Sequence, residues 1–575
     1  MKKIFFLYGF WLFSLLFVGI ILAISGIFWK SLILFSGVVF LFFSIFRFGK
    51  FFPRETFNDR GVWIVLTFFL AWSALSFHYS ESTVFSGRDQ GSFSEAAVRL
   101  VQNGGLEFSF PAEEEFFRVY GEGRAYNFPG FSYTDGGSLK TQFSLGYVTY
   151  LGEFYSWFGL SGLKLANLAA ILVFILSFYF LSQKILQKSA LFPPLFALTS
   201  FVFLWFSKFT LGENLALALL WFAILNLAEF WQVEKKIHFF LASLGLLLLV
   251  FVRIEALAIL AMAVLMFFLR YGKFEEIRKK IGTLNLAFWF LGGAVLLAGF
   301  SANIEFYILA AKGFLGGLPG TSGAEKGILG EIIHTFNVLS VYSLLIFLAF
   351  SILGVSILFQ RKDWSRLLPF FLVLPTVFFL LDPGISDDHP WMLRRFLYSL
   401  IPAFFLYSAV FLETFLKKRL LVWIFGGLLL FYNLLIFLPY ATFVPNRGLL
   451  EKTEKIADHF SSEDLILVDR RSSGDPHSML SGPLNFLFGK QAVYFFNPDD
   501  LSRINQERFS RIFFIIPDEN LDFYAKSAIL ERLVPVEEYL LEVPVLRNID
   551  EKSRINLPAK ETLFVSGGIY EFRKL

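Results

Sequence analysis

Long apolar segments, separated by short charged turns or turns that contain Gly and Pro, fill the first 440 residues of this chain. Most of these segments approach 20 residues, which is long enough to cross about 30 Å of hydrocarbon as an α-helix. The pattern therefore predicts an α-helical polytopic membrane protein with about thirteen transmembrane helices. The predicted spans are residues 4–24, 28–46, 62–79, 164–183, 190–207, 210–230, 237–252, 254–270, 284–303, 336–359, 366–382, 396–415 and 420–440.

The pattern changes near residue 446, where the hydropathy falls and short β-rich runs alternate with helical segments such as residues 522–533. This alternation predicts a small C-terminal α/β domain. Asp469, Arg470 and Arg471 follow the first predicted strand at its carboxyl end. Ligands of open α/β sheets bind at such ends, although most of these turns are structural. The predicted strands are residues 465–469, 492–496, 512–516 and 563–572.

The predicted elements divide the chain into three parts. Residues 1–60 form an N-terminal transmembrane hairpin, and residues 61–445 form a transmembrane domain that carries an outer loop at residues 80–163. Residues 446–575 form the C-terminal domain, in which no pairing of a nucleophile with a base can be discerned. We therefore expect this domain to be accessory, covering the mouth of a site formed elsewhere or helping to hold a substrate.

Composition supports a membrane fold. Hydrophobic residues make up 56% of the 575 residues and charged residues only 17%, below the roughly 25% of a soluble domain. The first apolar run follows Met1, Lys2 and Lys3 without a later small-residue cleavage site, so we expect a retained anchor. The absence of Cys excludes disulfides, thiolate nucleophiles and sulfur-ligated metals. The formal charge of +4 is too small to indicate a nucleic-acid partner.

Basic residues gather in alternate loops and predict the orientation of the chain. With a cytoplasmic N-terminus these loops fall inside, provided that residues 143–160 enter the interface and return without crossing. We therefore expect a multi-pass protein of the plasma or inner membrane with an extracytoplasmic C-terminus. The inner basic turns are residues 47–60, 235–236, 270–280, 361–366 and 417–419. The outer segments are residues 80–142, 303–335, 382–395 and those after 440.

The outer loop opens with a carboxylate beside a predicted helix. Residues 93–101 place Phe and Ala on one face and polar residues on the other, as in a helix lying on a membrane. Ser92 and Glu95 have the spacing of a capping box at its start. Asp89 then lies at the membrane–water boundary, where it either complements the helix dipole or acts in catalysis. The local sequence leaves both interpretations open.

A carboxylate just after an early membrane helix, followed by an Ala-rich amphipathic helix that ends in Gly, resembles the GT-C superfamily of membrane glycosyltransferases. This superfamily includes protein O-mannosyltransferases and lipid A aminoarabinose transferase. The likeness runs in order through residues 60–440, in short motifs. The further matching segments are KTQFSLG at residues 140–146 and on to 159, SKFTLGEN at 207–214, VRIEAL at 252–257, and RRFLY at 394–398 with Pro402.

The resemblance implies a GT-C-like fold and a glycosyltransferase that moves a sugar from a polyprenyl phosphate to an external glycan, lipid or protein, with inversion. A carboxylate at the outer interface then acts as general base, which typically contributes about 10²–10⁴-fold, and Asp89 takes this role. Fixed cations stabilise the charge that develops on the leaving lipid phosphate. The candidate cations are Arg394, Arg395, Arg253 and Lys208, and the possible supporting residues are Glu95, Glu213 and Lys140.

The candidate cations can also be explained by structural roles. Lys208 and Arg253 could instead extend to the interface, or pair with Glu213 and Glu255 at helix ends. The arginine pair at residues 394–395 lies on the predicted outer side against the positive-inside bias, which favours a ligand for it.

The chain departs from the family pattern where paired acids often occur. No Asp-X-Asp follows Asp89, which argues against a divalent-metal cofactor, and no metal ligand is assigned. Glu95, Glu81 or Asp135 could supply a second carboxylate. The Asp-Asp-His cluster at residues 387–389 could bind a cation, although a solvated loop is the simpler explanation.

Other functions stay open. A transporter or lipid flippase would show internal repeats and ionisable groups near the middle of the membrane, whereas the acidic residues here concentrate at outer helix ends. An O-antigen ligase or polymerase shares the lipid-linked donor but moves an oligosaccharide. The Gly-rich residues 313–330 predict either a flap that orders when substrate binds or a flexible connector.

Overall fold

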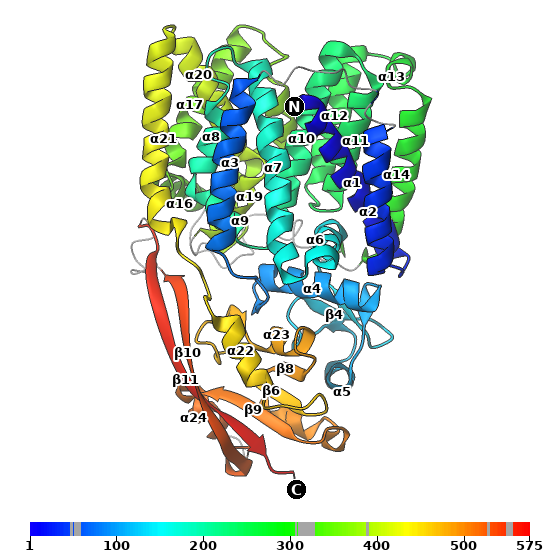
Figure 1. Ribbon diagram of the computed structural model, residues 1–575, viewed down its shortest axis with the longest axis vertical. Helices are drawn as coiled ribbons and strands as arrows, with labels where there is room; N and C mark the ends of the chain where they lie inside the picture. The colour runs from blue at the N-terminus through cyan, green and yellow to red at the C-terminus, as the bar shows by residue number, and fades with distance from the viewer. Residues whose placement is uncertain are drawn as a thin grey trace.

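A computed structural model of the chain describes residues 1–46, 50, 59–304, 307–308, 328–386, 390–525, 529–547 and 556–574. The cluster at residues 387–389 and most of the Gly-rich segment, up to residue 327, lie outside the described residues. Figure 1 shows a helical bundle at one end of the molecule and a β-sheet at the other, with the C-terminus beyond the sheet. The outer-loop elements lie between the two, so this loop is in a position to contact both.

The bundle consists mainly of apolar helices that lie side by side (Figure 1). Except for the short charged α13, which falls in a predicted basic turn, these helices follow the predicted spans in order. Most boundaries shift by a few residues, but α16 begins at Ile328, well before the span predicted at residues 336–359. They are α1 (Lys2–Ile24), α2 (Lys30–Phe46), α3 (Arg60–His78), α7 (Leu160–Ile185), α8 (Phe192–Thr199), α9 (Phe201–Ser207), α10 (Gly212–Val233), α11 (Lys236–Val250), α12 (Ala256–Tyr271), α13 (Phe274–Ile281), α14 (Thr283–Ala302), α16 (Ile328–Val341), α17 (Leu344–Gln360), α18 (Leu368–Val373), α19 (Arg394–Leu397), α20 (Leu400–Phe415) and α21 (Arg419–Ala441).

Several predicted spans are bent or broken helices. Within the described ranges, six helices are long and apolar enough to cross a membrane, and up to nine spans result if each bent pair counts as one. The break between α16 and α17 bends the chain by 106° at Ser343, which adopts a left-handed conformation with φ of 64°. The total of about thirteen spans stays a prediction.

The stretch predicted to turn back at the interface forms α6 (Leu145–Phe158). At 1.5 Å per residue, a helix of 14 residues is about 21 Å long, which is too short to cross the hydrocarbon. Gly159, with φ of 58°, ends α6 and starts α7. Residues 143–160 thus contain no helix of spanning length, as the orientation argument requires.

The outer loop folds into two helices and a small antiparallel sheet. The helix that carries Asp89 starts at that residue, earlier than predicted, so the expected capping box of Ser92 and Glu95 is wrong. The hydroxyl of Ser92 instead donates to the Pro129 carbonyl at 3.1 Å. The elements are β1 (Ser86–Gly87), α4 (Asp89–Asn103), β2 (Glu107–Phe108), α5 (Pro111–Tyr120), β3 (Gly123–Arg124), β4 (Phe131–Tyr133) and β5 (Leu139–Thr141), with the sheet order β2-β5-β4-β3.

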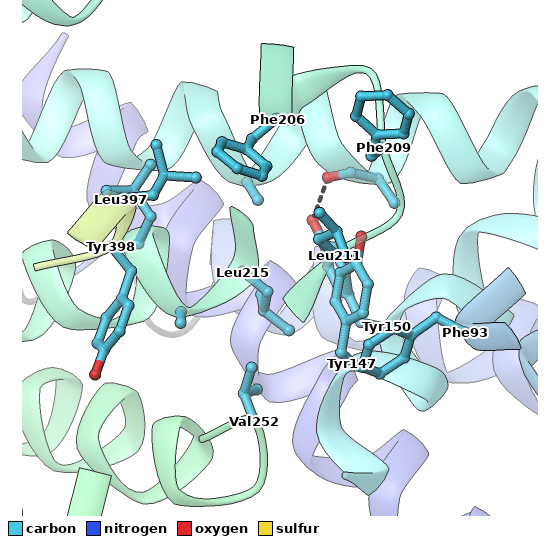
Figure 2. Close-up of a cluster of buried hydrophobic side chains, with 14 of the residues drawn as sticks. Phe93, Tyr147, Tyr150, Phe206, Phe209, Leu211, Leu215, Val252, Leu397 and Tyr398 are labelled. Carbon is cyan, nitrogen blue, oxygen red and sulfur yellow. Dashed lines mark hydrogen bonds between the residues drawn. The ribbon is translucent and has the colours of Figure 1, made fainter. Parts of the chain in front are cut away.

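The early start of α4 requires glycine at position 91. A Cβ at Gly91 would lie 1.6 Å from the Phe85 carbonyl oxygen, so only Gly lets the first turn of α4 pack against the preceding chain. Phe93, one turn further along α4, packs against Phe143, with ring centroids 4.3 Å apart, and its ring lies 5.2 Å from that of Tyr147 of α6. Figure 2 shows Phe93 and Tyr147 within a buried cluster that also includes side chains of the bundle. The start of α4 is therefore fixed against the end of the bundle.

The C-terminal domain is a mixed sheet with short helices, which confirms the predicted α/β pattern. Its sheet order is β10-β11-β9-β6-β8, in which β6 is parallel to β8 and β9, and β11 is antiparallel to its neighbours. All four predicted strands are present within a few residues. The elements are α22 (Leu449–Ala457), β6 (Leu465–Asp469), β7 (Ser478–Met479), α23 (Ser481–Phe486), β8 (Gln491–Phe495), β9 (Ile512–Pro517), α24 (Leu521–Ala525), β10 (Leu533–Arg547) and β11 (Ala559–Phe572).

Strand β10 was not predicted. Of the helix expected at residues 522–533, the structure confirms the part up to Ala525, whereas residues 530–532 form a 3-10 turn and Leu533 starts β10. Strand β10 begins at Leu533 and contains Pro535, Pro544 and several Glu residues, a composition that disfavours a strand. Its place at the edge of the sheet explains why these prolines are tolerated, because an edge strand leaves one row of donors unpaired.

Candidate active site

Two arginines alternate with three carboxylates where the outer loop meets the bundle. The Nη1 atom of Arg394 donates to Asp89 Oδ2 at 2.5 Å, and its Nε lies 2.7 Å from Glu213 Oε1. Arg253 Nη1 donates to the same Glu213 oxygen at 2.6 Å. The Arg253 guanidinium also donates to both Glu255 oxygens, at 2.7 and 3.2 Å. The five side chains form one continuous ion-pair chain, which we call the charge network.

The ends of four helices bring these side chains together. Asp89 is the first residue of α4, and Glu213 lies in the first turn of α10. Glu255 is the residue before α12, and Arg394 begins α19. The N-terminus of a helix favours a negative charge, so each carboxylate gains from the local dipole. Arg253 lies in the turn that joins α11 to α12 and bridges two of these helix starts.

Burial differs sharply along the charge network. The Glu213 side chain is 1% exposed and Arg394, Arg253 and Glu255 are 13–16% exposed, whereas the Asp89 side chain is 46% exposed. Charges held away from water require partners, and the two arginines and Glu213 supply them to each other. The network therefore has a buried, paired interior and one carboxylate that is accessible to solvent.

Arg395 and the aromatic ring of Trp391 border the network. The Arg395 guanidinium lies 5.3 Å from the centre of the Phe379 ring, close to Gly384. Arg88, which precedes Asp89, stacks over Trp391 at 4.7 Å, and this indole packs against Phe206 and Phe209 of the bundle. Neither Arg88 nor Trp391 was predicted from the sequence, although each is close in sequence to a predicted site residue.

The other predicted site residues lie at different places. The Lys208 ammonium donates to the backbone carbonyls of Ala441, at 3.3 Å, and Phe443, at 2.7 Å. Lys140 on β5 lies 3.4 Å from Glu107 Oε1 on the neighbouring strand. Both lysines have their own partners apart from the charge network. Glu95 is buried within the outer loop, where it accepts a hydrogen bond from the Ser86 hydroxyl at 3.0 Å.

Asp469 at the carboxyl end of β6 is fully engaged in the C-terminal domain. Its carboxylate accepts hydrogen bonds from the Arg471 backbone N–H at 2.8 Å, from Asn520 Nδ2 at 2.7 Å and from the Tyr524 hydroxyl at 2.8 Å. Burial raises the pKa of Asp469 although these bonds oppose the shift. This pattern supports a structural role for the turn after β6.

Comparisons with known proteins bear on the fold. No protein-family profile and no curated protein matches the chain. The chain is similar to the apo structure of ArnT from Cupriavidus metallidurans, with 10% identity, a TM-score of 0.53, and coverage of 88% of this chain and 98% of that one. ArnT bound to undecaprenyl phosphate gives a TM-score of 0.48 at 10% identity, covering 89% and 98%. An Archaeoglobus fulgidus oligosaccharyltransferase tethered with an acceptor peptide gives 0.48 at 12% identity, covering 82% and 71%.

The likeness to apo ArnT extends over most of both chains. It shows that this chain has the fold of ArnT.

Proposed function

We propose that this chain is an integral-membrane glycosyltransferase that moves a sugar from a polyprenyl phosphate to a hydroxyl of an external glycan, lipid or protein. The observation that carries the proposal is Arg394, which is held between the accessible Asp89 and the buried Glu213 at the end of a GT-C-like bundle. An accessible carboxylate beside fixed guanidinium groups provides a base for the acceptor and a binding site for a phosphate leaving group.

Asp89 acts as the general base in this proposal. The acceptor oxygen attacks the anomeric carbon, its proton passes to the Asp89 carboxylate, and the bond from the anomeric carbon to the phosphate oxygen breaks. The lipid phosphate leaves with the electron pair, and a single displacement inverts the anomeric centre. Stabilisation of the phosphate charge by fixed donors accounts for a large part of catalysis in such sites.

Arg394 changes partner in this proposal. In the structure its Nη1 donates to Asp89, so the base is neutralised by the residue that would hold the phosphate. A donor phosphate competes with Asp89 for this guanidinium and leaves the carboxylate able to accept a proton. Glu213 keeps Arg394 and Arg253 in place throughout, since it is buried and ion-paired with both. The base therefore becomes active only once the donor is bound.

We assign the donor phosphate to Arg394 and Arg253 of the network, with Arg395 beside them. The guanidinium of Arg can donate two parallel hydrogen bonds to one phosphate. Such binding requires a fixed orientation of the side chain as well as its positive charge. Lys208 and Lys140 stay outside this assignment because their partners, the Phe443 carbonyl and Glu107, are not part of the charge network. Glu95 is left as a buried support of the outer loop through its bond with Ser86.

The predicted orientation and division of the chain belong to the same proposal. The chain crosses the plasma or inner membrane about thirteen times, with the charge network and residues 446–575 on the extracytoplasmic side. The basic turns of the sequence support this orientation. The short α6 supports it as well, because a spanning segment there would invert every later loop.

The test uses the purified full chain in lipid nanodiscs and undecaprenyl phosphate, the lipid that ArnT binds in a solved structure. We expect undecaprenyl phosphate to raise the melting temperature, and Arg394→Ala to abolish the rise. Envelope lipid extracts from cells should then yield a sugar-bearing lipid that the protein consumes, with release of the free lipid phosphate. Translocation of the lipid with no loss of its sugar would contradict the proposal and favour a flippase.

A further inference from the structure

The C-terminal domain makes a backbone contact next to the proposed base. The two-residue strand β1 of the outer loop pairs in antiparallel fashion with β7 of the C-terminal domain. In this register Ser86 faces Met479 and Gly87 faces Ser478. One extended residue, Arg88, separates β1 from Asp89, so a shift of β1 is passed on to the first residue of α4.

Two glycines allow this close approach, one on each side of the contact. Gly87 has φ of 121°, and a Cβ there would lie 2.8 Å from the Pro476 carbonyl oxygen and 3.0 Å from the His477 Cα. A side chain at position 87 would meet backbone atoms, which cannot rotate away. At Gly482, in the first turn of α23, a Cβ would lie 2.2 Å from the Ser86 hydroxyl oxygen.

Buried polar contacts hold the same junction. The Ser86 hydroxyl is directed to Glu95 of α4 at 3.0 Å, so it cannot turn freely to make room for a larger residue at 482. Further along α4, Arg99 donates to Asn485 Oδ1, and Gln102 Nε2 donates to the Phe486 carbonyl at 3.0 Å. Helix α4 is thus bonded to α23 through two side chains, Arg99 and Gln102, and to β1 through Glu95.

The rest of the outer loop is bonded to the same domain. Asn127 and Tyr494 exchange two bonds, from Asn127 Nδ2 to the Tyr494 carbonyl at 2.7 Å and from the Tyr494 N–H to the Asn127 carbonyl at 3.3 Å. Arg508 lies 3.1 Å from Glu115 of α5. The loop and the domain therefore form one body, and the position of α4 depends on both the bundle and the domain.

We propose that the C-terminal domain positions the general base: the pairing of β1 with β7, made possible by Gly87 and Gly482, fixes Asp89 at the distance where it meets Arg394. Ser86, Gly87 and Gly482 are positioning residues, because they touch no reacting atom and act through Asp89. The inference rests on the proposed function for the role of Asp89, but the placement of the loop can be measured without turnover. In this proposal the C-terminal domain positions Asp89 in addition to covering the site.

The experiment compares Gly87→Ala and Gly482→Ala with the control Gly489→Ala in the full chain. Gly489 lies in the same domain and also has a positive φ, of 67°, but a Cβ there meets nothing within 4 Å. We expect kcat to fall at least tenfold in Gly87→Ala and Gly482→Ala, with an unchanged KM for the lipid donor. The control should stay within twofold of wild type. The double variant Gly482→Ala/Ser86→Gly, which removes the blocking hydroxyl, should recover most of the lost kcat relative to Ser86→Gly alone.

Hydrogen exchange gives a second measurement that needs no activity. The amides of residues 84–91 should exchange at least tenfold faster in Gly482→Ala than in wild type, and the Ser86→Gly change should reverse this. Unchanged exchange of this segment in both glycine variants, or an equal loss of kcat in the Gly489→Ala control, would overturn the positioning role. If wild type transfers no sugar but the exchange differences appear, the positioning holds and the proposed function fails.

Discussion

Arg394 joins the accessible carboxylate of Asp89 to the buried carboxylate of Glu213 through two different nitrogen atoms of one guanidinium. Nη1 lies 2.5 Å from Asp89 Oδ2, and Nε lies 2.7 Å from Glu213 Oε1. Loss of the hydrogen bond to Asp89 leaves the ion pair with Glu213 in place. This arrangement lets Arg394 release the base and keep its own position when an anion arrives.

Replacement of Arg394 by Ala should lower both donor affinity and turnover. The change removes a fixed donor for the leaving phosphate, a loss that costs about 2.7–4 kcal/mol, or roughly 10²–10³-fold in rate, at comparable sites. Transfer rates and binding of undecaprenyl phosphate should be measured on the same preparation. Arg118→Ala is the matched control, because that arginine is 61% exposed on the outer loop. Equal effects in the two variants would contradict a specific role for Arg394.

Replacement of Glu213 by Gln should destabilise the protein as well as inactivate it. Glu213 is 1% exposed and ion-paired with two arginines, and removal of one partner from a buried ion pair typically costs about 3–5 kcal/mol. Glu451→Gln, in an exposed helix pair with Lys455, should leave stability nearly unchanged, because water screens such surface pairs. The measurement is the melting temperature of each variant. Similar melting temperatures for Glu213→Gln and Glu451→Gln would show that the charge network is not needed for stability.

Stability should depend on pH through Glu113 of α5. This side chain is buried, and burial raises its pKa from 4.5 to about 7. Because the folded pKa lies above the unfolded one, its contribution to stability is complete below about pH 4.5 and is lost as the pH rises through 7. The free energy of unfolding of Glu113→Gln, compared with that of wild type at the same pH, should therefore rise between pH 5 and 8 by about 2–3 kcal/mol. If the free energies of unfolding of the two proteins differed by the same amount at every pH from 5 to 8, the raised pKa of Glu113 would be contradicted.

The sequence predicted the elements that leave a periodic pattern. Apolar segments of nearly 20 residues located the helices, and β-rich runs located the four strands of the C-terminal domain that were expected. The left-handed Ser343 that bends the pair α16 and α17 leaves no such pattern, because it depends on packing. The Pro-containing strand β10 was missed because its own composition opposes a strand and only its place at the sheet edge permits it.

The sequence predicted individual residues of the candidate site, but not the contacts between them. Asp89, Glu213, Arg253 and Arg394 were each singled out, and the bond between Arg253 and Glu255 follows from their closeness in sequence. The contact of Arg394 with both Asp89 and Glu213 joins distant parts of the chain, so no local pattern reveals it. The pairing of β1 with β7 involves two residues on each side, which is too short for any periodicity.

Turnover by Asp89→Asn, measured with a sugar-bearing polyprenyl phosphate in nanodiscs, tests the central claim most directly. Asn has nearly the same shape as Asp but cannot take up the proton of the acceptor hydroxyl. We therefore expect the transfer rate to fall by about 10²–10⁴-fold, with an unchanged melting temperature. Donor affinity should be kept or increased, because Arg394 is no longer held by a carboxylate at position 89. Transfer at the wild-type rate by Asp89→Asn would contradict the account.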